Sequence, residues 1–139
     1  MEDRRMLAVL TVNSLADNAT AGDGLVTLRE AIIASNTDTI TDLGQTGSDV
    51  DTIQFAPGLT GTITLAGATQ LSITDAVIIN GPGAANLTIN GANASRIFNI
   101  TDDAVDVTLN GMTLTGGNPG ANAGGAIFSK ALGLPTANN

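Results

Sequence analysis

The sequence has no cysteine, no histidine, no tryptophan and no tyrosine among its 139 residues. The absence of cysteine excludes disulfides, thiolate metal sites and thiol chemistry, and zinc is further disfavoured because histidine is missing as well. Three phenylalanines are the only aromatic side chains, so an interior must be built from Ile, Leu, Val and Ala. A carbohydrate-binding platform of stacked aromatic rings is disfavoured for the same reason.

Positive charge is also scarce, because five Lys and Arg stand against 13 Asp and Glu and the net charge is −8. Nucleic acid binding is therefore not expected, since it requires a cluster of cations. No stretch approaches the ~20 apolar residues of a membrane span. The apolar run MLAVLTV at Met6–Val12 is too short for a signal peptide, and we predict it to be a first strand. An export signal is therefore not expected within this sequence.

The segment VTLREAIIASN has the clearest helical pattern in the chain. Thr27 can serve as the N-cap, and Glu30 three residues later completes a capping box that satisfies two backbone N–H groups. Apolar residues recur at spacings of three and four around Ile32, which gives one mostly apolar face. The pattern predicts a helix over about 27–36, with Asn36 as its terminator.

Short apolar runs follow one another from Asp51 onward. Each holds two or three branched apolar residues and is bounded by Gly, Asn, Asp or Pro, which is typical of short strands. The runs are TIQF, GTITL, QLSI, AVIING, NLTING, RIFNI, VDVTLNG, MTLTGG and GGAIF. Similar segments recur at intervals of 24 to 30 residues, as from Ile53 to Val77 and from Val77 to Val107. The runs are therefore repeats of one pattern.

A loose period of this length, with about three short strands in each repeat, indicates a solenoid. We therefore predict an all-β fold, a single-stranded parallel β-helix of about three rungs, where a rung is one turn of the coil. Alternate side chains stack inward as aliphatic ladders in such a coil, and Asn side chains at the bends form ladders between rungs. The competing fold is an antiparallel sandwich, in which the Asn-Gly pairs form hairpin turns.

The chain divides into three parts under this prediction. Residues 1–50 hold the N-terminal strand, the helix and a polar loop, residues 51–129 hold the rungs, and residues 130–139 form an irregular tail. A β-helix exposes unpaired strand edges and apolar side chains at an open end. Because the helix directly precedes the first rung, we predict that it caps that end.

The motifs stand in a fixed order over roughly residues 9–129: TVNSLADNATAGDGLVTLREAIIASN, DTIQF, GTITL, VIINGPGAANLTINGANASRIFNI, VTLNGMTLTGG and GGAIF. This series resembles the CSLREA-type N-terminal region of bacterial right-handed parallel β-helix proteins. Val26 and Thr27 stand where that motif has Cys-Ser, so the cysteine is lost and the capping hydroxyl is kept. The start, EDRRMLAV, resembles a short box found after the signal sequences of exported planctomycete proteins. The resemblance implies a pectate-lyase-like, right-handed β-helix in an exported or surface protein, some of whose relatives carry outer-membrane-protein-like repeats.

Polysaccharide lyases and hydrolases also use this fold, which makes Arg96 a candidate base. Lyase chemistry needs a basic residue beside a carboxylate, usually with Ca²⁺, and Arg96 is the only cation of the strand region before Lys130. Asp75 and the segment TDDAVD offer paired carboxylates for glycoside hydrolysis if they lie about 5–9 Å apart. Turn chemistry is the favoured explanation of these carboxylates, and a structural role is favoured for Arg96, either capping carbonyls or pairing with an acid, so no catalytic residue is predicted. Arg29 and Glu30 are likewise assigned to helix capping and a solvated face.

Two acidic segments have the oxygen ligands that calcium prefers. The first is the loop DNATAGDG, with Asp17 and Asp23, and the second is TDDAVD, with Asp102, Asp103 and Asp106. The loop lacks the alternation and the closing Glu of an EF-hand, so ordinary Asx turns are the favoured interpretation. No cofactor is expected, and calcium is the alternative.

The C-terminal region has no counterpart of the capping helix, because GGAIF is followed by the irregular SKALGLPTANN. An uncapped rung is a template for further pairing, so we expect further rungs, a second copy or a cell-surface partner at this end. The sequence thus predicts a non-enzymatic structural or adhesion-like segment of an exported or cell-surface protein, truncated or from the N-terminal part of a longer chain. The alternatives are a fragment of a polysaccharide lyase or hydrolase and a calcium-binding module.

Overall fold

Ten short strands and one helix make up the described part of the chain. The computed structural model describes residues 7–20, 22–47, 50–66, 69–100, 106–118 and 127–129, so the tail 130–139 lies outside the described residues. The elements are β1 (Leu7–Val12), α1 (Leu28–Thr37), β2 (Val50–Phe55), β3 (Gly61–Thr64), β4 (Leu71–Ile73), β5 (Val77–Asn80), β6 (Leu87–Asn90), β7 (Phe98–Ile100), β8 (Val107–Asn110), β9 (Thr113–Thr115) and β10 (Ile127–Ser129). The fold is therefore mostly β with one helix.

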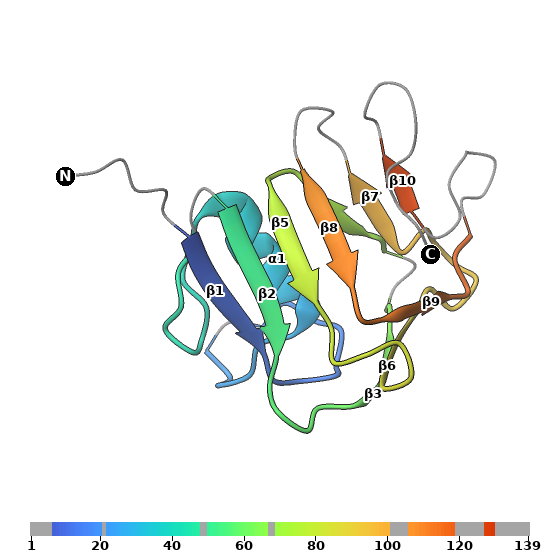
Figure 1. The fold of residues 1–139 in the computed structure, drawn as a ribbon, viewed down its shortest axis with the longest axis horizontal. Helices are drawn as coiled ribbons and strands as arrows, with labels where there is room; N and C mark the ends of the chain where they lie inside the picture. Colours follow the sequence, from blue (N-terminus) through green and yellow to red (C-terminus); the bar gives the residue numbers. More distant parts are fainter. Residues whose placement is uncertain are drawn as a thin grey trace.

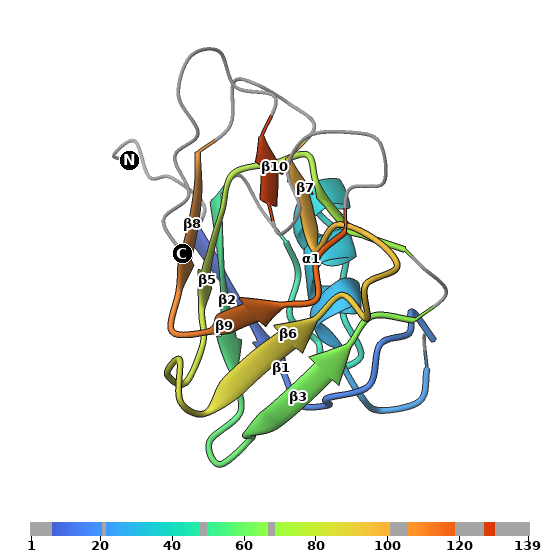
Figure 2. The same cartoon turned by 90° about the vertical axis from the view of Figure 1, so that its right-hand side faces the viewer.

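The strands form three parallel sheets with the orders β1-β2-β5-β8, β3-β6-β9 and β4-β7-β10. From β2 onward, the chain visits the three sheets in turn, and each strand pairs with the strand three places later. We call each such passage a layer: β2–β4, β5–β7 and β8–β10. Figure 1 shows β1, β2, β5 and β8 side by side, and Figure 2 shows β3, β6 and β9. The antiparallel sandwich is therefore wrong, because its Asn-Gly hairpins require antiparallel neighbours.

Aliphatic side chains on successive strands stack on one another in the interior. In the first sheet, the paired positions Leu10, Ile53 and Ile79 are fully buried. In the second sheet, Ile63 lies opposite Ile89 and both are buried. Burying a side chain of this size contributes about 1.5–3 kcal/mol. These ladders, which continue through Leu71 and Phe98 in the third sheet, make up most of the core.

The register between layers differs in part from the sequence spacing. Ile53 pairs with Ile79, two residues beyond the Val77 that the spacing suggests. The interval from Val77 to Val107 is as predicted, since these two residues pair. A shift of two residues keeps the same face of a strand inward, so the hydrophobic pattern cannot distinguish the two registers.

Asn-Gly pairs at the ends of β5 and β8 bring neighbouring layers into close contact. The Asn110 Nδ2 donates to the Asn80 Oδ1 at 2.9 Å, so the amide ladder that the sequence predicts is present here. A Cβ on Gly81 would collide with the carbonyl oxygen of Gly111. Gly111 also has a φ of +68°, in the left-handed region that glycine adopts more readily than residues with a side chain do. The two layers can therefore approach this closely only with glycine at both positions.

Helix α1 begins with the capping box that the sequence predicts. The Thr27 side chain accepts from the Glu30 backbone N–H, and the Glu30 side chain accepts from the Thr27 N–H at 2.8 Å. The helix ends at Thr37 rather than at Asn36, and Asp38 closes it in the left-handed conformation with a φ of 55°. Its buried face contacts β1, β2 and β4, and Figure 1 shows it behind β1 and β2. Among the described residues, no helix has the length and apolarity to cross a membrane.

The packing of α1 can be tested with two adjacent isoleucines that lie on opposite faces. Ile32 is 2% exposed and Ile33 is 43% exposed. We expect Ile32→Asp to destabilise the protein by more than about 4 kcal/mol, because an unpaired carboxylate is placed in the core. Ile33→Asp changes helix propensity equally and should cost about 1 kcal/mol or less. Urea unfolding monitored by circular dichroism measures both, and equal losses would contradict the packing.

Candidate functional site

At the N-terminal end of the strand stack, side chains bond the outer edges of two of the three sheets. β4 is an outer strand of its sheet, so one of its edges has no neighbouring strand in the described part of the chain. Asn36 of α1 lies along this edge: its Nδ2 donates to the Ser72 carbonyl at 2.9 Å, and its Oδ1 accepts from the Thr74 N–H at 3.0 Å. One side-chain amide thus supplies the acceptor and the donor that a strand would supply.

Arg29 and Asp17 close the chain segment that leads into β4. The Arg29 Nε and Nη2 donate to the two carboxylate oxygens of Asp17 at 2.8 and 3.0 Å. Its Nη1 and Nη2 also donate to the carbonyls of Gln70 and Thr69, each at 3.0 Å, and Asp17 accepts from the Ala66 N–H at 2.7 Å. The two side chains are only 19% and 2% exposed. The assignment of Arg29 to a solvated face is therefore wrong.

The outer edge of β1 is closed in the same manner by Gln45. Its Oε1 accepts from the Thr11 N–H at 2.7 Å, and its Nε2 donates to the Thr11 Oγ1 at 3.1 Å. A short antiparallel bridge between Ile40 and Thr46 holds Gln45 in place. Edge strands of two sheets at this end thus have side-chain partners.

The opposite end of the stack has outer strands of a different kind. β8, β9 and β10 are the last strands of their sheets, and no further strand pairs with them among the described residues. The half-buried side chains there line a pocket of about 380 Å³, and the apolar ones are Leu109, Met112, Leu114 and Ile127. Leu109 and Leu114 continue the interior ladders, being paired with buried residues of β5 and β6. The last described layer therefore presents apolar side chains together with strand edges.

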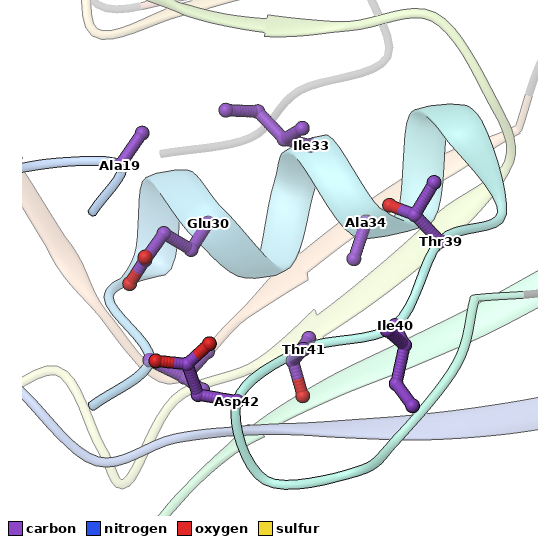
Figure 3. A pocket seen from close by; sticks show the side chains of 9 residues that line it. Ala19, Glu30, Ile33, Ala34, Thr39, Ile40, Thr41 and Asp42 are labelled. Atoms are coloured by element: carbon purple, nitrogen blue, oxygen red, sulfur yellow. The ribbon is translucent and has the colours of Figure 1, made fainter. Parts of the chain in front are cut away.

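A second pocket, of about 220 Å³, lies between α1 and residues 39–42. Figure 3 shows Glu30 and Asp42 at the end of this pocket near the start of α1. The Glu30 carboxylate is held in the capping box, and the Asp42 oxygens accept from the N–H groups of Gly22 and Gly24, each at 2.9 Å. These backbone donors lower the pKa of the Asp42 carboxyl below its ordinary value. Both carboxylates are committed to the backbone, so the pocket offers an apolar wall rather than an acid–base pair.

The acidic residues predicted as calcium ligands have other partners or lie apart. Asp17 is bound to Arg29, and the Asp23 Oδ1 accepts from the N–H two residues on at 2.9 Å, which is an Asx turn. Asp106 is exposed just before β8, and Asp102 and Asp103 lie outside the described residues. Among the described residues, no group of three or more potential ligands is brought together. Asp17 could serve as a calcium ligand only in competition with its ion pair to Arg29.

Arg96 and Asp75 are not brought together as a base and a carboxylate. Arg96 precedes β7, and its Nη1 lies 3.5 Å from the Gln70 Oε1. Asp75 follows β4, and its Oδ1 accepts from the Ala76 N–H at 2.9 Å. β4 and β7 pair with Leu71 opposite Phe98, so the two residues lie at opposite ends of this pairing. The residues of a pectate-lyase-like base site are therefore not assembled in the described part of the chain.

Three roles at the N-terminal end were missed by the sequence analysis. The amide of Asn36, the amide of Gln45 and the carboxylate of Asp42 all bind backbone groups that are distant in the sequence. Two glycines with positive φ, Gly22 and Gly24, are the one local signal, because such turns leave N–H groups free to bind an anion. The spacing between donor and acceptor follows no short motif.

No protein-family model, no curated protein and no solved structure matches this chain. The functional argument therefore depends on the sequence motifs and on the contacts described above.

The ion pair between Arg29 and Asp17 can be tested with a double-mutant cycle. Replacing either residue with Ala leaves the other charge with reduced solvation and no ionic partner. We expect each single substitution to cost about 3 kcal/mol, the lower end of the range for buried pairs, because Arg29 retains some exposure. The double variant should be more stable than the sum of the single losses predicts, by about 0.5–3 kcal/mol. Additive losses in urea unfolding would show that the pair is not coupled.

The N–H groups of Gly22 and Gly24 that bind Asp42 predict that part of the protein's stability is lost in acid. Because the pKa of Asp42 is lowered in the folded state, its contribution to stability is complete above the ordinary Asp pKa of about 3.9 and is lost as the pH falls below it. Asp42→Asn should therefore reduce stability at about pH 6 and reduce it less at about pH 3. Urea unfolding midpoints at the two pH values measure the effect, and a constant difference between variant and wild type would contradict it.

Proposed function

We propose that this chain is a non-enzymatic structural or interaction segment of an exported or cell-surface protein. In this proposal it is a right-handed, single-stranded parallel β-helix of about three rungs. The segment is closed at its N-terminal end and receives a further layer of strands at the other. The single observation that carries the proposal is the difference between the two ends of the described stack. Side chains bond the edges of β1 and β4, whereas β8, β9 and β10 are the last described strands of their sheets and lie beside an apolar pocket.

The closed coil is supported by the order in which the strands are used. The chain passes through the three sheets in the same sequence in each layer, and all pairings between layers are parallel. The connection from β2 to β5 is a crossover between parallel strands of one sheet, and such connections are right-handed in about 98% of cases. The resemblance to CSLREA-type proteins agrees with this hand and with export to the cell surface.

The interaction role is supported by the chemistry of the last layer. Half-buried Leu109 and Leu114 extend ladders whose other members are buried, so another layer would cover apolar surface that now lies at a rim. A parallel sheet also gains hydrogen bonds when another strand joins its edge. A further layer of strands, from a longer chain or from a second copy, therefore fits this end better than a small ligand does.

The enzymatic and calcium-binding alternatives have less support among the described residues. Arg96 lies away from Asp75, and Asp17 is held by Arg29. Cleavage of polygalacturonate in the presence of Ca²⁺, abolished by Arg96→Ala, would favour the lyase instead.

The open end can be tested by placing a charge in its apolar pocket. Because the N-terminal end is closed, association of the isolated chain through the C-terminal end should give a closed two-fold dimer rather than a fibre. We expect sedimentation analysis to show a monomer–dimer equilibrium for the wild type. Leu109→Lys should abolish the dimer, since its ammonium group can reach solvent only while the end is uncovered.

The matched control is Val9→Lys, which places the same charge on β1 at a position that is 46% exposed. This variant should dimerise like the wild type. Circular dichroism establishes that both variants are folded. A wild-type chain that stays monomeric at all accessible concentrations, or equal effects of the two lysines, would overturn the proposed role of the open end.

A further inference from the structure

Three Asn-Gly pairs end strands of this protein, and their glycine N–H groups differ in hydrogen bonding. The Gly81 N–H donates to the Asn110 carbonyl at 2.8 Å, and the Gly91 N–H donates to the Thr115 carbonyl at 2.9 Å. The Gly111 N–H has no hydrogen-bond acceptor among the described residues, although the Gly111 carbonyl accepts from Gly83 at 2.9 Å. Gly111 is thus the one glycine of the three whose backbone N–H has no acceptor in the part of the chain that the structure describes.

Asn110 also differs from the other two asparagines in the number of strands beside it. Asn80 is flanked on both sides, by Gln54 of β2 and Asn110 of β8. Asn90 is flanked by Thr64 of β3 and Thr115 of β9. Asn110 has a strand neighbour on one side only within the described residues, and it is exposed. Local opening requires the least free energy at such an edge.

We propose that Asn110–Gly111 is a site of self-modification, at which Asn110 converts to aspartate or isoaspartate faster than the other two asparagines do. The Gly111 backbone nitrogen loses its proton and attacks the Asn110 Cγ, forming a five-membered succinimide. The Cγ–Nδ2 bond breaks, and the nitrogen leaves as ammonia. Water then adds to either carbonyl of the ring, and the ring opens to give the carboxylate and the restored or displaced peptide bond. Water is the only co-reactant.

The product changes the contact between the two layers. Asn110 Nδ2 is the donor of the 2.9 Å bond to the Asn80 Oδ1, and the product carries an oxygen at this position. An acceptor then faces an acceptor, and a negative charge is added at the rim of the C-terminal pocket, where Asn110 and Gly111 are lining residues. The modification therefore weakens the amide ladder at the open end. This inference is independent of the proposed function.

The test is peptide mapping by mass spectrometry after incubation of the folded chain at mildly alkaline pH. Asn80 and Asn90 each require one further backbone hydrogen bond to break, so we expect Asn110 to be modified about tenfold faster than either. In urea the three rates should become similar, because each pair has an aliphatic residue before its Asn and a Gly after it. Asn110→Gln should remain unmodified at that position, since its longer side chain does not form the five-membered ring.

Equal rates at the three pairs in the folded chain, or faster modification of Asn80 or Asn90, would overturn the inference. The Leu109→Lys variant separates this result from the proposed function, because it is expected to be monomeric, and its own rates in urea correct for the lysine that then precedes Asn110. If Asn110 is modified faster than Asn80 and Asn90 in the folded variant, the inference is supported whatever the oligomeric state of the wild type. Protection of Asn110 in wild-type chain at high concentration, absent in Leu109→Lys, would in addition support association through the open end.

Discussion

The outer edge of β4 is the constraint on which the N-terminal half of this structure depends. Its backbone groups need partners, and the side chain of Asn36 supplies them instead of a strand, while Arg29 binds the carbonyls of the segment that leads into β4. The helix can do this because its capping box fixes where it begins and its apolar face rests on the core. A helix cannot extend a sheet, so the same contacts that satisfy β4 also end the stack at this side.

Arg29 shows how one cation can organise a chain that has few. Its guanidinium holds the Asp17 carboxylate and two carbonyls at once, which joins the loop before α1 to the segment that leads into β4. The planar fork of donors suits this geometry, whereas a lysine ammonium would not make the paired contact. Removing one partner leaves a poorly solvated charge. The pair therefore favours the observed packing of α1 and its preceding loop against the segment that leads into β4.

The arrangement of strands and helix follows from sequence patterns, whereas the register between layers and the long-range side-chain contacts do not. Short branched runs at a repeating interval predict parallel layers, and the capping box places the helix within one residue of its observed start. The register of Ile53 was missed by two residues, because an even shift leaves the same face buried. Arg29, Gln45 and Asp42 could not be assigned, since their partners are set by tertiary packing and not by spacing.

The Asn-Gly pairs connect the stability of the stack with its chemistry. Glycine is required where layers approach closely, and asparagine supplies the amide that bonds from one layer to the next. The same dipeptide is reactive when its glycine nitrogen is free, and stacking removes that freedom by engaging the N–H, as at Gly81 and Gly91. An added layer that occupied the Gly111 N–H would therefore stabilise the β8 edge and protect Asn110 in a single step. An Asn-Gly pair at an exposed edge is therefore open to modification, and the same pair is protected where another layer stacks on it.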